Sequence, residues 1–593
     1  MIDGLTQEQA APKARILSRF RGEILLGWIV VLTLVILIGA PLLSVLLQAF
    51  LPGLFFGDST VIGPGTLLQV FQRPLWRVSL RNSLVLATGA MLVGGGLGTM
   101  LAILRHSYAF RCAQALDTTA WVLLIMPSFV IAQGWILFAS RGGIANQWLG
   151  LDFIGQMIFT PWGLIAIMAL KNYPFAYLTV AAAMRWDVAN YTNAARLCGA
   201  NPWRVMTSIR VPLLLPAVLS GMMLVFVDTV GDFGLPAALA TSYRYPTLTY
   251  SIYVAISQSP IRFDLAGVLS IYLVGITAVA IGIHMAVIRS SFYDFLTASA
   301  KDRELVRPVF APLLTGIALA FVMISLVLPI GTSALVSVLE SISAGPIWGN
   351  FTLRHYDAFF EPGSPFLASL RNSLAIASIA GVTALVIGVA GSYMATFVRF
   401  WLNGLIDIIS TVTLAVPGVI LGVGYIFVWN QPWLDRLDLR IYGSPIILVL
   451  AATAGAIPLA MRTTLGSFAQ IPASFLAAAS MQGAPLFRRL RTIVLPLAFT
   501  ALLSALLASF GTTVFDLAVS SILRPPSFQV LPVTINRQFQ MGNFGLSTAA
   551  TFVGTVITVG IILFLDLGLR RLMVNQIKTT GDDGESKRSS DAN

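Results

Sequence analysis

Charged side chains are scarce in this sequence. Asp, Glu, Lys and Arg make up 10% of the 593 residues, whereas they make up about 25% of an average soluble domain. The sequence therefore excludes an ordinary soluble globular protein. Cysteine is scarce too, because only Cys112 and Cys198 are present. We place both in or beside the cytoplasm, so we predict no disulfide framework.

Two further scarcities limit the chemistry that the chain can carry. None of the five lysines ends a Gly-x-x-x-x-Gly-Lys-Ser/Thr loop, so the sequence lacks this nucleotide-binding motif. The three histidines, His106, His284 and His355, are isolated and lack the spacing of metal ligands, so we expect no metal site. No nucleophile elbow or catalytic pair of carboxylates stands out. We predict that the chain is not an enzyme and binds no cofactor itself.

Apolar residues are abundant, at 57% of the chain, and the mean hydropathy is +0.84. About 20 apolar residues are needed to cross a bilayer, and windows of this kind recur twelve times. We therefore predict an all-α polytopic membrane protein with twelve transmembrane helices. The windows lie near residues 24–48, 82–104, 118–139, 161–181, 213–231, 266–288, 311–339, 372–397, 405–429, 445–461, 497–518 and 547–569.

The net charge of +12 suggests a nucleic-acid partner, but membrane topology accounts for it better. With a cytoplasmic amino terminus, the cytoplasmic segments hold 24 of the 37 Lys and Arg residues and the external ones about 12. This is the excess that the positive-inside rule requires. The apolar run from Ile24 is too long for a signal peptide and lacks a convincing cleavage site. We predict cytoplasmic amino and carboxyl termini and no nucleic-acid partner.

The second half of the sequence repeats the first. Leu80-Arg81-Asn82-Ser83-Leu84 recurs 290 residues later, and Pro174 recurs as Pro458, 284 residues later. Six spans per copy is an even number, so both copies face the same way and form parallel repeats. We predict a cytoplasmic segment, a six-span half, a cytoplasmic linker, a second six-span half and a polar cytoplasmic tail. Their bounds are 1–23, 24–289, 290–310, 311–571 and 572–593.

Two cytoplasmic loops carry the same pattern, and we name residues 193–212 loop 1 and residues 477–496 loop 2. In each loop a pair of alanines is followed after three residues by glycine, and nine residues later by Ile-x-Val/Leu-Pro. This predicts a short helix that ends at a glycine with positive φ, and then a proline that opens the next membrane helix. The residues concerned are Asn193, Ala194, Ala195, Gly199, Arg204, Ile209 and Pro212 in loop 1, and Ala477, Ala478, Ala479, Gly483, Arg488, Arg489, Ile493 and Pro496 in loop 2.

This spacing resembles the EAA loop of binding-protein-dependent ABC importer permeases, which docks on the ATPase subunit. The glutamate of that pattern is Asn193 in loop 1 and Ala477 in loop 2, and Val211 replaces its leucine in loop 1. The resemblance implies the type I ABC importer permease fold, alternating access and a place in the bacterial inner membrane. It also implies two cytoplasmic ATPase subunits that hold ATP and Mg²⁺, and a periplasmic solute-binding protein.

The loops have two interpretations. As coupling helices, their small residues let a short helix lie flush in a groove of an ATPase subunit, and Arg204, Arg488 and Arg489 reach acidic groups at its rim. Alternatively, the small residues make an ordinary contact between each loop and its own bundle.

Asp228, Asp232 and Asp516 occur at the ends of spans, and Asp516 repeats the position of Asp232. Carboxylates near hydrocarbon usually face a cavity or a partner, so these three are candidates for the translocation pathway. Counting the helix rise from Pro212 puts Asp232 near the outer face. The alternative is helix capping, or ion pairing with Arg244 or Arg262. For Asn82 and Ser83, and for their repeats Asn372 and Ser373, we expect a helix N-cap.

The Asp-Phe-Gly stretch at residues 232–234 resembles that of fused permeases of the ferric-iron group, whose relatives import thiamine or aminoalkylphosphonates. The resemblance makes ferric iron the first expectation, with thiamine or a compound like 2-aminoethylphosphonate as alternatives. Two other classes stay open. A secondary transporter driven by an ion gradient needs charges deep within several spans, and Lys171 is the one clear candidate. A purely structural scaffold leaves the repeated loops unexplained.

Overall fold

The computed structural model describes residues 10–51, 65–184, 194–195, 197–243, 245–289, 307–438 and 441–590. Asn193, Arg244 and most of the linker at 290–310 lie outside these ranges. The described residues are almost all helical and contain no strand; Leu339 and Phe351 form an isolated antiparallel bridge.

The helices of the first half are α1 (Ala10–Leu34), η1 (Val35–Gly39), α2 (Ala40–Gln48), α3 (Gly65–Gln72), α4 (Pro74–Ser107), α5 (Ala113–Ile125), α6 (Ser128–Ala139), α7 (Ile144–Gln147), α8 (Asp152–Ile158), α9 (Pro161–Met184), α11 (Pro202–Val205), η3 (Met206–Arg210), α12 (Val211–Gly231), α13 (Gly234–Tyr243), α14 (Leu248–Ser257) and α15 (Phe263–Arg289). Those of the second half are α16 (Ala311–Val322), η5 (Met323–Val327), α17 (Leu328–Ser337), η6 (Trp348–Asn350), α18 (Arg354–Phe360), α19 (Pro365–Phe397), α20 (Asn403–Ala415), α21 (Gly418–Trp429), α22 (Pro432–Asp435), α23 (Pro445–Phe468), α24 (Ala473–Met481), α25 (Leu486–Arg489), η7 (Leu490–Val494), α26 (Leu495–Leu497), α27 (Phe499–Val514), α28 (Leu517–Leu523), α29 (Leu531–Gln540) and α30 (Phe544–Ser590).

The count of twelve spans agrees with the described part of the chain. Nine stretches are long and apolar enough to cross a bilayer, and three bent pairs of helices bring the number to at most twelve. All twelve coincide with the windows expected from the sequence.

Two of the expected spans, 118–139 and 405–429, are broken at proline. The chain turns by 107° between α5 and α6, and by 116° between α20 and α21. The breaks fall at Pro127 and Pro417, and the preceding Met126 and Val416 have extended backbone, because the proline ring disfavours a helical residue before it. These two breaks lie at matching positions of the repeat, and a third pair of helices, bent by 82°, lies in the second half.

The first span of each half packs against the other half. Helices α1 and α2 pack on α19, α20 and α21, whereas α16 and α17 pack on α5 and α6. The Tyr425 hydroxyl of α21 donates a hydrogen bond to the Leu37 carbonyl, at 2.9 Å. The halves of the sequence are thus not two separate bundles, and their helices share a core.

Two glycines allow this exchange of spans. A Cβ atom added to Gly134 would lie 2.2 Å from the Pro329 carbonyl oxygen, and one on Gly424 would lie 2.3 Å from that of Pro41.

Overpacking of this kind costs about 1–3 kcal/mol. We therefore expect Gly134→Ala and Gly424→Ala each to lower the thermal midpoint of the detergent-solubilised protein. Gly96→Ala is the matched control, because nothing lies within 4 Å of its added Cβ. An unchanged midpoint for Gly134→Ala would contradict the exchange.

The expected helix caps at Asn82 and Ser83 are wrong. Helix α4 already begins at Pro74, since proline suits the first turn of a helix. Asn82 instead donates to the Pro246 carbonyl at 3.0 Å, and Ser83 accepts from the Leu248 backbone at 2.8 Å. The second half repeats these contacts between Asn372 and Gln529, at 2.9 Å, and between Ser373 and Leu531, at 2.8 Å.

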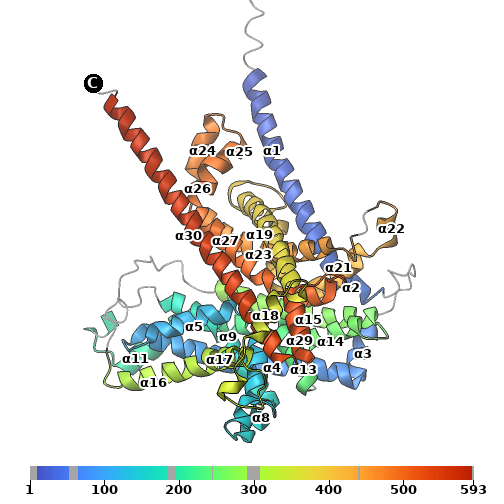
Figure 1. Cartoon of the computed structure of the whole chain (residues 1–593). Helices are drawn as coiled ribbons and strands as arrows, with labels where there is room; N and C mark the ends of the chain where they lie inside the picture. Colours follow the sequence, from blue (N-terminus) through green and yellow to red (C-terminus); the bar gives the residue numbers. More distant parts are fainter. Residues whose placement is uncertain are drawn as a thin grey trace, which may run out of the picture.

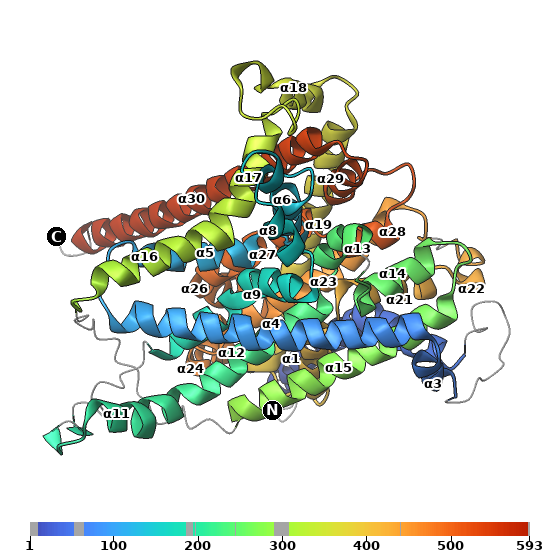
Figure 2. The same ribbon diagram turned by 90° about the horizontal axis from the view of Figure 1, so that it is seen from below.

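The two loops lie apart from one another. Figure 1 shows α24 and α25, from loop 2 and the residues just before it, at the top of the view between α1 and α30, whereas α11 from loop 1 lies at the left edge. Figure 2, seen from below, shows α18 projecting from the opposite side of the molecule to α11. Loop 1 and loop 2 therefore lie in different parts of the molecule.

Candidate translocation cavity and loop surfaces

A cavity of about 750 Å³ lies between the two halves. The first half contributes residues of α5, α6, α9, α12 and α15, and the second half contributes residues of α20, α23 and α27. A second cavity, of about 490 Å³, adjoins it and shares eight lining residues with it. The shared residues are Pro127, Ser128, Asp228, Gly231, Asp232, Val416, Thr512 and Phe515. Both broken spans therefore reach this space.

The charged residues of the cavity come mostly from the first half. Lys171, on α9, is only 7% exposed and lies 3.5 Å from the Asn172 amide oxygen. Asn172 donates to the Thr229 hydroxyl at 3.0 Å, which brings the end of α12 beside the middle of α9. Asp228 lines the same cavity as Lys171. Side chains of opposite charge thus line one cavity.

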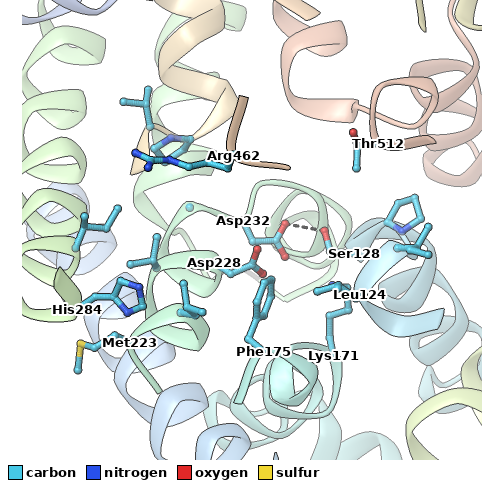
Figure 3. Close-up of a pocket in the computed structure, with 18 of the residues that line it drawn as sticks. Leu124, Ser128, Lys171, Phe175, Met223, Asp228, Asp232, His284, Arg462 and Thr512 are labelled. Carbon is cyan, nitrogen blue, oxygen red and sulfur yellow. Dashed lines mark hydrogen bonds between the residues drawn. The ribbon is translucent and has the colours of Figure 1, made fainter. Parts of the chain in front are cut away.

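One oxygen of Asp232 is fixed by hydrogen bonds, and the other is not. Its Oδ1 atom accepts from the Ser128 hydroxyl at 2.6 Å and from the Gly234 backbone at 2.9 Å. Its Oδ2 atom is buried and has no hydrogen-bond partner. Arg262, one expected ion-pair partner, binds Asp264 instead, at 2.8 Å. In Figure 3, Asp228 and Asp232 lie together, and a dashed line joins Asp232 to Ser128.

Asp516 is a helix cap, although it also lines the smaller cavity. Its side chain accepts from the Val519 backbone at 3.1 Å and caps α28. The capping alternative is therefore correct for this residue. Among the described residues, no group of three or more His, Cys, Asp or Glu side chains is placed to hold a metal ion.

Asp228 and Asp232 lie at or just after the end of α12, beside the middle of α9. Asn172 and Thr229, which are hydrogen-bonded, place the end of α12 level with the middle of α9. The chain then continues into α13 and α14, and the Thr249 hydroxyl of α14 donates to the Asp232 carbonyl at 2.8 Å.

The cavity is asymmetric despite the repeat. The counterparts of Lys171, Asn172 and Asp228, 284 residues later, are Gly455, Ala456 and Thr512. The second half instead supplies Arg462, whose guanidinium lies 3.0 Å from Asp407. Figure 3 shows Arg462 on the side of the cavity opposite Phe175.

The two loops share one backbone design. Gly199 and Gly483 both have φ of +80°, as predicted for glycines that end a helix. The residue after each glycine donates its backbone N–H to an alanine carbonyl, from Ala200 to Ala195 at 2.9 Å and from Ala484 to Ala479 at 3.1 Å. These are the bonds of a glycine-terminated helix end. Helix α12 then begins one residue before Pro212, and α26 one residue before Pro496. Ile209 and Ile493 lie in the π-helical turns η3 and η7.

Large apolar side chains project from the loops. Leu197 is 90% exposed, and Met481, at the matching position of loop 2, is 88% exposed. Phe487 of loop 2 is 74% exposed. The sequence pattern drew attention to the alanines and missed these three residues, although an apolar residue within a polar loop is itself a signal of a contact surface.

The two arginines of α25 have different surroundings. Arg488 is exposed, as is Arg204 in loop 1. Arg489 is buried, with a side chain 8% exposed, and lies 2.7 Å from Glu23 of α1. The expectation that Arg489 reaches out to a partner therefore needs revision, because its charge is already matched within the chain.

Comparison with known proteins gives a family and several relatives. The family described as "Binding-protein-dependent transport system inner membrane component" matches residues 94–281 and 387–573, which together are more than half of the chain. The chain is 24% identical over 563 residues to the ferric transport system permease protein FbpB of Actinobacillus pleuropneumoniae, covering 93% of this chain and 79% of that protein. It is 22% identical over 538 residues to the Fe(3+)-transport system permease protein FbpB 2 of Haemophilus influenzae, covering 90% and 96%.

Shorter permeases match one part of the chain only. The molybdenum transport system permease protein ModB of Escherichia coli is 27% identical over 187 residues, covering 30% of this chain and 79% of that protein. Two matched segments in one chain confirm the internal repeat.

Proposed function

Because the chain belongs to the family of binding-protein-dependent transport system inner membrane components, as a fused permease of the type I ABC importer kind, we propose that it conducts a cationic solute through the cavity between its halves. A periplasmic binding protein delivers the solute, and two cytoplasmic ATPase subunits, which hold ATP and Mg²⁺, drive its passage. Loop 1 docks on one ATPase subunit and loop 2 on the other. Both chain termini then lie in the cytoplasm.

The unpaired Oδ2 atom of Asp232 is the observation that supports a cation most directly. A buried carboxylate oxygen without a hydrogen-bond donor favours binding of a positively charged solute, since burying an unpaired negative charge costs free energy. Ferric iron is the first choice of cargo, because the relatives that match most of the chain are named for it. Thiamine, which is a cation, or a compound like 2-aminoethylphosphonate, which offers the cavity only an ammonium group, is the alternative.

The paired loops support ATP as the energy source. Two loops with the same helix end, related by the repeat, suit two identical partner subunits. Alternating access requires that ATP and the loaded binding protein prefer different conformations of the complex. In this mechanism the ATPase dimer draws loop 1 and loop 2 together. The cavity between the two halves then opens to one side of the membrane at a time.

A reconstitution experiment distinguishes this mechanism from an ion-gradient transporter. We expect radioactive ferric iron to enter proteoliposomes only when the permease, both ATPase subunits, the loaded binding protein and ATP are all present. Uptake by the purified chain alone, driven by a proton or sodium gradient, would favour the secondary transporter.

Charge reversal at Arg488 tests docking. We expect Arg488→Glu combined with Arg204→Glu to lower co-purification of the ATPase subunits at low salt by about tenfold, because like charges across an interface are repulsive. Membrane insertion should be unchanged, since both side chains are exposed. Arg141→Glu is the matched control, because Arg141 is exposed and lies between the expected spans 118–139 and 161–181, outside both loops. Equal effects of the two changes would contradict the docking role.

A further inference from the structure

The ion pair between Glu23 and Arg489 joins loop 2 to a helix from the other end of the sequence. The two side chains are 20% and 8% exposed, and their closest atoms are 2.7 Å apart. The Arg489 Nε atom is buried and has no hydrogen-bond partner. The positive charge of Arg489 is therefore balanced through its ion pair with Glu23. A buried arginine next to the exposed Arg488 indicates a specific contact in place of a general basic surface.

An apolar cluster shared by α1 and loop 2 accompanies the ion pair. Leu26 lies one helical turn after Glu23 and therefore on the same face of α1. It packs in an apolar cluster that includes Leu486 and Leu490, which flank Arg489 in loop 2. Figure 1 shows α1 passing beside α25. Loop 2 and α1 are thus joined by an ion pair and share one apolar cluster.

Helix α1 leads from loop 2 to the walls of the cavity. It continues through η1 into α2, which packs on both α21 and α15. Helix α21 begins directly after Pro417, which lines the cavity, and α15 contributes His284 and Met285 to it. A displacement of loop 2 can therefore reach a wall from each half through one continuous stretch of helix.

The two positions that match this ion pair across the repeat are uncharged. The residue that matches Arg489 in loop 1 is Val205, which is buried. The residue that matches Glu23, by the 288-residue offset between Pro41 and Pro329, is Ala311. Neither can form an ion pair, so the two loops differ although their backbones agree.

We propose that the Glu23–Arg489 ion pair is a strut that transmits the movement of loop 2 to α1 and so to the cavity. Both residues are positioning residues, and the inference rests on the proposed docking of loop 2 on an ATPase subunit. Loop 2 then reaches the cavity through α1 as well as through its own helix α27, whereas loop 1 acts through α12.

Glu23→Gln in the complete complex tests the strut. We expect ATPase co-purification and basal ATP hydrolysis to stay within about twofold of wild type, whereas uptake of radioactive ferric iron per ATP hydrolysed falls about tenfold. The exchanged pair, Glu23→Arg with Arg489→Glu, should regain at least half of the wild-type ratio. Glu361→Gln, an exposed acid outside both loops, is the control and should change nothing.

The outcomes separate the strut from the proposed function. If the wild-type complex shows no ATP-driven uptake, the proposed function fails and the strut fails with it. If wild type transports and Glu23→Gln keeps the full ratio of uptake to hydrolysis, only the strut is wrong. Loss of ATPase co-purification in Glu23→Gln would mean that the pair serves docking, which also overturns it. If Glu23→Gln does not fold, the exchanged pair decides: a low ratio in a folded protein, or failure of that variant to fold, overturns the strut.

Discussion

Replacing Asp228 and Asp232 together by asparagine is expected to lower uptake of ferric iron by about 100-fold or more. A contact to a charged group contributes about 1.5–3 kcal/mol, and about 1.4 kcal/mol corresponds to a factor of ten, so two lost carboxylates suffice. Co-purification of the ATPase subunits should persist, because both residues line the cavity and lie outside the two loops. The measurement is uptake into proteoliposomes containing the complete complex.

Asp516→Asn is the matched control for this experiment. It makes the same chemical change in a residue that lines the adjoining cavity. Asparagine caps a helix about as well as aspartate, so α28 should keep its cap and uptake should stay within about threefold of wild type. A loss as large as that of the double variant would mean that Asp516 contacts the solute as well.

Lys171 provides the sharper control. Among the described residues, Asp228 and Asp232 are the acids that line the same cavity as Lys171. Neutralising both leaves this buried lysine without an acid in its cavity, which destabilises a protein independently of transport. Lys171→Gln added to the double variant should restore stability without restoring uptake. If the triple variant transported iron at the wild-type rate, the two carboxylates would serve only to balance Lys171, and their role toward the solute would be wrong.

The spans and the loop ends were predictable because they depend on local sequence. Hydrophobic length sets where a helix can cross a bilayer, and a glycine followed at fixed spacing by proline sets where each loop helix ends. Gly199 and Gly483 have the same φ, as the repeated pattern required. Such features need no knowledge of which distant segments meet.

What the sequence did not predict depends on contacts between distant segments. The exchange of first spans is visible only when Gly134 is seen against Pro329 and Gly424 against Pro41. Whether Arg489 is exposed or buried likewise depends on its contact with Glu23, 466 residues away. The breaks at Pro127 and Pro417 could have been predicted from the sequence, because proline inside an apolar window disfavours a straight helix.

The second large effect is expected at the exposed apolar residues of loop 2. Met481→Ala combined with Phe487→Ala should lower ATPase co-purification about 30-fold or more, because a hot-spot side chain contributes about 2 kcal/mol or more to a protein interface. Met481 and Phe487 are 88% and 74% exposed, so little packing within the chain is lost. The thermal midpoint of the isolated permease should therefore stay constant while binding of the ATPase falls.

Trp348→Ala is the control that also tests the orientation of the chain. Trp348 is 94% exposed and lies between the expected spans 311–339 and 372–397, which alternation from a cytoplasmic amino terminus places on the external side. Its removal should therefore leave ATPase binding unchanged. If Trp348→Ala weakened ATPase binding and the loop 2 variant did not, the loops would face the wrong side of the membrane for docking. Loss of binding in the loop 2 variant alone would place the ATPase on an apolar surface that surrounds the glycine-terminated helix end, with the exposed arginines at its rim.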